Sequence, residues 1–157
     1  MKEKFQHEKI LVEASVVLST RRLKLKQARI ATGKSPEEIA AASGITISYY
    51  DLEEIDGELN RNISLGELLR LASTLGIRTR FIFDDDTEGQ TITPAQLCVS
   101  IRKYLYTTGM SIKEFEDRVG FVIEPSLRDN SNIFNWNIDC LRFVCAELGI
   151  DWHLALP

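Results

Sequence analysis

Apolar residues recur along much of the chain at the three- and four-residue spacing that places side chains on one face of an α-helix. The clearest case precedes Gly76, where the apolar stripe comprises Leu65, Leu68, Leu69, Ala72 and Leu75. Such patterns predict four short helices in the first half of the chain. They cover roughly residues 20–32, 35–44, 47–55 and 64–76.

Residues that start and stop helices separate these segments. Ser35 and Glu38 have the spacing of a capping box, in which a hydroxyl and a carboxylate each accept a hydrogen bond from a free backbone N–H. Pro36 falls in the first turn, where its missing N–H costs nothing. Ser64 and Glu67 repeat the box. Glycines suited to a left-handed C-cap close these helices at Gly33, Gly44 and Gly76.

The residues that start and stop helices recur later in the chain. Matching residues are 76 positions apart at first and, after a shorter connecting region, 73 positions apart. The first set of pairs is Gly33 and Gly109, Ser35 and Ser111, Glu38 and Glu114, and Gly44 and Gly120. The second set includes Leu65 and Ile138, Leu68 and Leu141, Ala72 and Cys145, and Gly76 and Gly149. A second copy of the unit is therefore predicted, with Ser111 and Glu114 as its capping box and Asn137 as the cap of its last helix.

Each copy ends in a short run in which apolar and other residues alternate. The runs are residues 80–83 and 152–156, and Phe81 and Phe83 fall on Leu154 and Leu156 at the 73-residue offset. Alternation of this kind is typical of a half-buried strand. We therefore expect the two runs to pair as a two-stranded β ribbon near a pseudo-twofold axis.

The chain divides into an N-terminal extension (1–19), a first unit with its terminal strand (20–83), an acidic linker (84–92) and a second unit with its terminal strand (93–157). Residues 5–19 are predicted to be helical, because apolar residues recur there at helical spacing, and to pack on the core or on a partner. The three aspartates that open the linker are interpreted as solvated, since no other cation ligands accompany them. Thr93 and Pro94 are expected to cap and begin the next helix.

Composition agrees with a folded protein: 44% of the 157 residues are hydrophobic and 27% are charged. No apolar run reaches the roughly 18–20 residues that a membrane span needs. The first residues also lack the apolar core of a signal peptide. These observations predict a cytoplasmic protein.

Few residues have the pattern of a catalytic or metal site. The two histidines, His7 and His153, lie near opposite ends of the chain, and the three cysteines form no C-x-x-C pair. We expect Cys98, Cys140 and Cys145 to be reduced and mostly buried, and His153 to be structural. No cofactor or metal is predicted, and an enzyme is the least favoured class.

The segment from Ser35 to Thr46 resembles the helix-turn-helix of Cro/repressor-like (XRE-type) DNA-binding proteins. Ala40 matches the small residue that lets two helices cross, Gly44 the turn, and Ile45 the residue that enters the core. The resemblance covers residues 20–77 well, and it reaches 96–150 only through the internal repeat. It implies an all-helical domain whose third helix enters the major groove.

The resemblance also implies functional residues. Those placed to contact bases or backbone on the third helix are Thr46, Ser48, Tyr49 and Tyr50. Those placed to neutralise phosphates are Arg21, Arg22, Lys24, Lys26, Arg29 and Lys34, in a stretch from 20 to 34 that contains no acid. The basic stretch is equally open to interpretation as a solvated helix face whose long side chains cover the core.

Some residues depart from the family pattern. Pro36 stands where such motifs commonly carry glutamine, Glu116 replaces the small residue in the second copy, and Pro125 interrupts the third helix of that copy. That helix is expected to start late or to be distorted, and the second unit is not expected to read DNA. Residues 36–58 hold seven acids and no lysine or arginine, and the net charge is -4.

The acidic stretch supports a second hypothesis, in which the same fold binds a basic protein. Its docking face would comprise Asp51, Glu53, Glu54, Asp56 and Glu58. Ordinary solubility charge is the alternative interpretation of these acids.

The sequence thus predicts an all-α fold of tandem lambda-repressor-like helix-turn-helix units, related by a pseudo-twofold, with a small β ribbon. The favoured function is a DNA-binding transcriptional regulator whose first unit contacts duplex DNA. The alternative is an immunity protein or antitoxin that neutralises a basic toxin. A monomer that acts as a pseudo-dimer is expected, and a homodimer is the other possibility.

Overall fold

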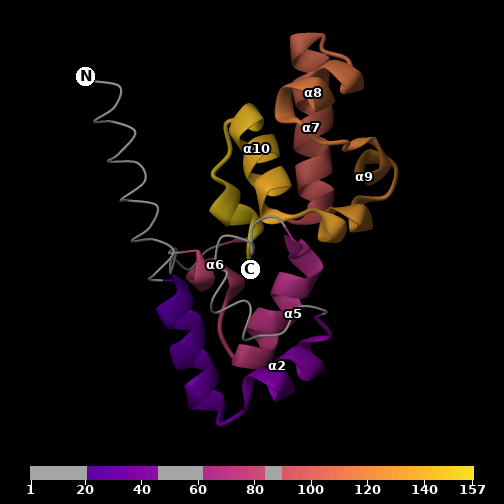
Figure 1. Cartoon of the computed structure of the whole chain (residues 1–157). Helices are drawn as coiled ribbons and strands as arrows, with labels where there is room; N and C mark the ends of the chain where they lie inside the picture. Colours follow the sequence, from indigo (N-terminus) through magenta and orange to yellow (C-terminus); the bar gives the residue numbers. More distant parts are fainter. Residues whose placement is uncertain (1–20, 46–61, 84–89) are drawn as a thin grey trace, which may run out of the picture.

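The computed structural model describes residues 21–45, 62–83 and 90–157, and within these ranges the fold is all-α (Figure 1). Residues 21–32 form the first described helix. The others are α2 (Pro36–Ser43), α5 (Leu65–Leu75), α6 (Thr79–Ile82), α7 (Pro94–Thr108), α8 (Ile112–Val119), α9 (Glu124–Arg128) and α10 (Ile138–Leu148), with 3-10 turns η2 (Asn130–Asn135) and η3 (Trp152–Ala155). No helix among these residues has the length and hydropathy to span a bilayer.

The predicted helix starts are confirmed by their capping hydrogen bonds. In α2, the Ser35 hydroxyl accepts from the Glu38 N–H at 3.2 Å, and the Glu38 carboxylate accepts from the Ser35 N–H at 3.3 Å. Ser64 and Glu67 make the same reciprocal pair at the start of α5. Thr93 caps α7, Ser111 caps α8 and Asn137 caps α10. The box predicted for Ser111 and Glu114 forms only in part, because only the Ser111 hydroxyl accepts, from the Glu114 N–H at 3.1 Å. Local sequence therefore sets where these helices begin.

The N-terminal half, which we define as described residues 21–83, packs helix 21–32, α2 and α5 around one core. Leu25, Ile39 and Leu68 are completely buried there. Figure 1 shows α2 and α5 side by side at the end of the molecule away from α7 and α8. The apolar stripe predicted on α5 is confirmed, although Leu69 is only partly buried.

The C-terminal half, residues 90–157, packs α7, α8 and α10 around Phe115. The Tyr104 ring meets the Phe115 ring edge-on at 5.7 Å between centroids. The Tyr104 hydroxyl donates to the Glu147 carboxylate at 2.5 Å, and Arg118 pairs with the same carboxylate at 2.8 Å. These contacts tie the three helices together at the far end of the molecule from α2.

The predicted β ribbon is wrong. Residues 79–82 form α6, and residues 152–155 form a 3-10 turn that begins with an Asp151 cap. Adjacent Ile82 and Phe83 are both buried, which a strand cannot achieve against one core face, because its successive side chains point in opposite directions. In the structure, the helical turn of α6 and the residue after it place both side chains in the core.

The two runs nevertheless lie together. The Arg80 N–H donates to the Pro157 carbonyl at 3.1 Å, and the Arg80 guanidinium donates to the Leu156 carbonyl at 3.0 Å. The Phe83 and Trp152 rings pack edge to face, with centroids 5.2 Å apart. The sequence correctly places the two runs beside each other and assigns them the wrong local structure.

A second junction joins the two halves where α5 and α10 begin. Ser64 and Asn137, which are 73 residues apart, form an isolated antiparallel bridge, and the Leu65 N–H donates to the Trp136 carbonyl at 2.7 Å. Gly66 faces the backbone of Phe134, because a Cβ added there would lie 3.3 Å from its carbonyl oxygen. The first turn of α5 thus lies against the segment that leads into α10.

The helix that contains Pro125 is short, whereas the sequence predicted a late start or a distortion: α9 has five residues and carries the proline in its first turn. Its start is capped by the Glu116 carboxylate, which accepts from the N–H groups of Ile123 at 2.6 Å and Glu124 at 3.2 Å. The glutamate that replaces a small residue in the second copy is therefore a cap for α9.

Three predictions fall on residues outside the described ranges and stay predictions. They are the helix at 5–19, the third helix at 47–55 and most of the linker at 84–92, of which only residues 90–92 are described. Those three residues are not helical.

Candidate nucleic-acid interface

Helix 21–32 and the turn after it carry all six residues predicted to contact phosphates. Arg22, Lys26 and Lys34 are exposed, and Arg29 is partly exposed with its guanidinium 3.4 Å from the Lys34 carbonyl. No acid lies between residues 20 and 34. The exposed cations can therefore attract an anionic backbone.

Arg21 and Lys24 are placed differently, because both face α6. The Arg21 guanidinium lies 4.5 Å from the centre of the Phe83 ring, and the side chain is buried. The Lys24 ammonium lies 4.5 Å from the centre of the Phe81 ring and donates to the Phe81 carbonyl at 3.0 Å. Their stems and charges pack α6 against helix 21–32.

The turn that follows α2 has the residues expected of a tight connection between helices. Gly44 adopts φ 65°, a left-handed conformation that favours glycine, and Ile45 is buried directly after it. Ser43 is fully buried, and its hydroxyl donates to the Ile39 carbonyl at 2.7 Å. Ala40 is partly buried against the core. These contacts fix the direction in which the chain leaves α2.

Arg70 is a residue of this region that the sequence analysis missed. Its Nε donates to the Ser43 carbonyl at 2.9 Å, so it holds the end of α2 against α5. The available signal was that Arg70 is the single basic residue of α5, set within an apolar helix. A cation near the last carbonyls of a helix is also favourable to the helix dipole.

The remaining predicted residues lie outside the described ranges. The base-contacting candidates Thr46, Ser48, Tyr49 and Tyr50 follow Ile45 directly in the chain. The acidic docking candidates are Asp51, Glu53, Glu54, Asp56 and Glu58. Both sets stay predictions.

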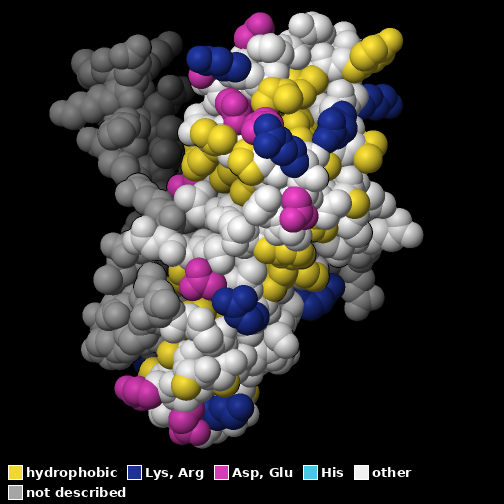
Figure 2. Space-filling view, turned by 90° about the vertical axis from the view of Figure 1, so that its right-hand side faces the viewer, with side chains coloured by type: hydrophobic (Ala, Val, Ile, Leu, Met, Phe, Trp, Pro, Cys, Tyr) yellow, Lys and Arg dark blue, Asp and Glu magenta, His cyan; other side chains and the backbone are white. Residues whose placement is uncertain are grey.

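The C-terminal half presents a different charge pattern at the corresponding helix. α7 contains only two cations, Arg102 and Lys103, and the Arg102 guanidinium donates to the Leu127 carbonyl. Figure 2 shows a face of this half on which basic and acidic side chains are interspersed. Residues 89–113, which include α7, also contain no acid, but they hold only three cations, whereas residues 20–34 hold six.

Cys140 and Cys145 are buried, and His153 is hydrogen-bonded within the fold. Burial raises the pKa of Cys140 to about 12, and burial likewise raises that of Cys145 to about 12. His153 lies between the Asp151 carboxylate, at 2.7 Å, and the Phe83 carbonyl, at 3.0 Å. Within the described ranges, no three His, Cys, Asp or Glu side chains gather as a metal site would require.

Comparison with protein-family models, curated proteins and solved structures found no match to this chain.

Proposed function

We propose that the protein is a helix-turn-helix DNA-binding protein, a transcriptional regulator whose first unit contacts duplex DNA. One observation carries the proposal. α2 has a capping box, ends in the left-handed Gly44 and is followed by the buried Ile45, and it belongs to the same half as a helix with exposed cations. In this arrangement the residues after Ile45 would form the recognition helix.

The exposed cations are assigned the phosphate contacts. Arg22, Lys26 and Lys34 would each neutralise a phosphate, with Arg29 beside them, whereas Arg21 and Lys24 would hold α6 in place. Contacts of this kind position a protein on the duplex without reading its sequence. Base recognition is assigned to the candidates between Thr46 and Tyr50.

The second copy is proposed as a degenerate unit that supports the first as a pseudo-dimer partner. In support, the residues paired by the repeat adopt the same local structure: Gly33, Gly44 and Gly76 and their partners Gly109, Gly120 and Gly149 all have positive φ. The short α9 and the mixed charges of its surface argue against DNA contact by this copy.

The deciding experiment is a salt titration of binding to random duplex DNA, followed by fluorescence anisotropy with the full chain. We expect the logarithm of the affinity to fall linearly with the logarithm of salt concentration. Arg22→Ala and Lys34→Ala should each reduce the slope by about 0.9. The matched control Lys103→Ala removes an exposed cation from α7 and should leave the slope unchanged. Absence of binding at low salt would refute the DNA-binding proposal.

The alternative is a protein-binding immunity protein or antitoxin, and the net charge of -4 and the acids between 36 and 58 favour it. A basic toxin would meet complementary charge on the docking face, which speeds association. The test is co-purification with the product of an adjacent gene. Charge reversal at Asp51, Glu53 and Glu54 should then slow association, while unchanged rates would exclude this face.

A further inference from the structure

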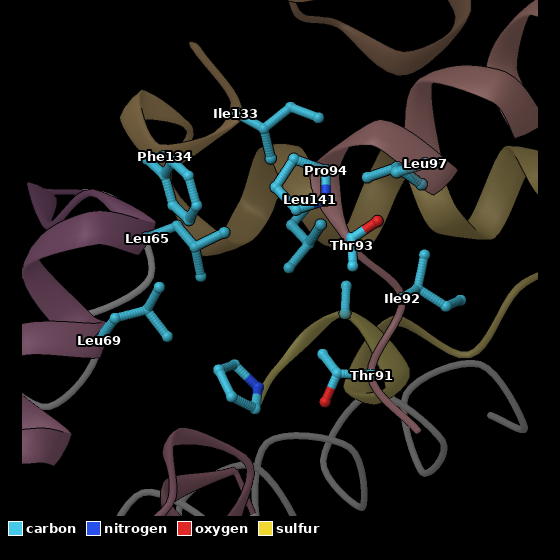
Figure 3. A pocket seen from close by; sticks show the side chains of 12 residues that line it. Leu65, Leu69, Thr91, Ile92, Thr93, Pro94, Leu97, Ile133, Phe134 and Leu141 are labelled. Atoms are coloured by element: carbon cyan, nitrogen blue, oxygen red, sulfur yellow. The ribbon is translucent and has the colours of Figure 1, made fainter. Parts of the chain in front are cut away.

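An apolar cavity of about 250 Å³, partly open to solvent, lies where the two halves meet (Figure 3). Leu65 and Leu69 come from α5, Pro94 and Leu97 from α7, and Leu141 from α10. The rest of the lining is Thr91, Ile92, Thr93, Ile133, Phe134, Ala155 and Pro157. Five separate segments of the chain therefore meet around one space.

The lining determines what this space can hold. Among the described residues that line it, only Thr91 and Thr93 carry a side-chain hydroxyl, and none has a charged side chain. The Thr93 hydroxyl already accepts from the Gln96 N–H at 3.2 Å, as part of the α7 cap. Figure 3 shows Thr91 on the side opposite Ile133 and Phe134. A charged ligand would lose its hydration here without gaining a partner.

Two backbone N–H groups of lining residues already donate hydrogen bonds within the protein. The Leu65 N–H donates to the Trp136 carbonyl at 2.7 Å, and the Ile92 N–H donates to the Leu154 carbonyl at 2.7 Å. Water that enters from the open side would find few hydrogen-bond partners there, so its displacement by an apolar molecule is favoured. The chemistry therefore selects an uncharged, largely apolar occupant.

The volume of the cavity sets the size of molecule that it can hold. Protein interiors are packed as densely as organic crystals, and voids larger than a water molecule are few. An apolar cavity of about 150 Å³ is large enough for benzene. The cavity between the halves exceeds that volume, so a single aromatic ring with a small substituent or a fused ring fits it.

We propose that this cavity binds one small, uncharged, apolar molecule of about the size of toluene or indole. Because the ligand would contact α5 from one half and α7 and α10 from the other, it would favour the arrangement in which the halves are docked. This inference does not rest on the proposed DNA-binding function, and its test requires no DNA.

The test is titration of the full chain with toluene and, separately, with indole. We expect each probe to raise the thermal unfolding midpoint by about 2 °C or more at saturation. Methyl NMR signals of Leu65, Leu69 and Leu141 should shift, while those of the exposed Leu23 should not. Benzoate, a charged analogue of toluene, should bind at least tenfold more weakly. No shift with either neutral probe would overturn the proposal.

A cavity-filling variant locates the site. Leu69 is partly buried and its side chain points into the cavity, so Leu69→Trp should occupy the space and weaken probe binding at least tenfold. The matched control Leu23→Trp makes the same change at a residue that is 54% exposed on helix 21–32, and should bind the probes like the unaltered protein. Equal binding by Leu69→Trp would overturn the proposal. Should that variant not fold, the NMR shifts of the unaltered protein decide the question.

Discussion

At the scale of single residues, Glu116 supplies the N-terminal cap that α9 lacks in its own sequence. Ile123, the residue before α9, makes no side-chain cap, and the carboxylate of Glu116 from α8 takes that part. Unsatisfied N–H groups at a buried helix start destabilise the fold, because they lose their hydrogen bonds to water and gain no other acceptor. Glu116 therefore ties α8 to α9.

We predict that Glu116→Ala lowers the free energy of unfolding by about 1–2 kcal/mol, since two backbone N–H groups lose their acceptor. Urea unfolding followed by circular dichroism measures the loss. Glu116→Gln keeps one acceptor oxygen and should lose less. Asp117→Ala changes the exposed neighbour on α8 and should stay within about 0.5 kcal/mol. Equal stability of Glu116→Ala and Asp117→Ala would show that the cap does not contribute to the free energy of unfolding.

The buried thiols predict a chemical property at the same scale. Because burial raises the pKa of Cys140 and Cys145 to about 12, both remain protonated at pH 8 in the folded protein. The pKa of Cys98 is raised as well, mainly by burial. Thiols react as thiolates, so Ellman's reagent should react slowly with the native chain and quickly with all three cysteines in urea. Fast reaction of the native chain would contradict the burial.

The sign of the pH dependence follows from the same shifts. In the unfolded chain these thiols ionise near their ordinary pKa of about 9, whereas in the folded chain they stay protonated up to about pH 12. Their contribution to stability is therefore complete below pH 9 and is lost as the pH rises beyond it. The free energy of unfolding should decrease between pH 9 and pH 11.

At the scale of elements, helix 21–32 has two faces with different surroundings. One face carries Lys24 against Phe81 of α6, and the other leaves Lys26 exposed. Two lysines only two positions apart thus differ in their roles, because a helix turns by 100° per residue and separates them around its axis.

We predict that Lys24→Ala mainly lowers stability, whereas Lys26→Ala mainly lowers the salt dependence of DNA binding. Lys24→Ala removes a hydrogen bond and a ring contact, and should lower the free energy of unfolding by about 1 kcal/mol. Lys26→Ala should leave stability within about 0.5 kcal/mol and reduce the salt slope of DNA binding by about 0.9. Urea unfolding and the anisotropy titration distinguish them. Identical effects of the two variants on both measurements would refute this division.

At the scale of the whole molecule, the two halves share one hydrophobic core. Ile63, Leu65 and Phe83 belong to the same buried cluster as Trp136 and Leu156. The junction adds the bridge between Ser64 and Asn137 and the bonds from Arg80 to the chain's last residues. Elements that share a core tend to unfold together.

We therefore predict one cooperative unfolding transition. The two tryptophans, Trp136 and Trp152, both lie in the C-terminal half, so their fluorescence reports on that half, while far-ultraviolet circular dichroism reports on helices of both. Midpoints from the two signals in urea should coincide. Leu156→Ala, which empties a fully buried site, should lower both midpoints equally, at a cost of about 2–4 kcal/mol. Separate midpoints would show that the halves are independent.

The helix boundaries could be predicted from the sequence because their causes are local. A Ser and a Glu three residues apart satisfy free N–H groups within one turn, as at Ser35 and Glu38, and a glycine such as Gly44 ends the helix through its own backbone freedom. The internal repeat was visible for the same reason, since it preserves this local punctuation. Such features need no knowledge of distant neighbours.

The misassigned segments and the missed contacts depend on residues far apart in the chain. The sequence cannot show that Ile82 and Phe83 are both buried, that Arg21 lies over Phe83, or that Arg70 reaches the end of α2, because each contact is made only after packing. Thus the sequence by itself determined the repeat and the ends of α2, α5, α7, α8 and α10. Tertiary structure decided which cations face the core, how residues 79–82 and 152–155 fold, and that an apolar cavity lies between the halves, because burial depends on what the folded chain brings together.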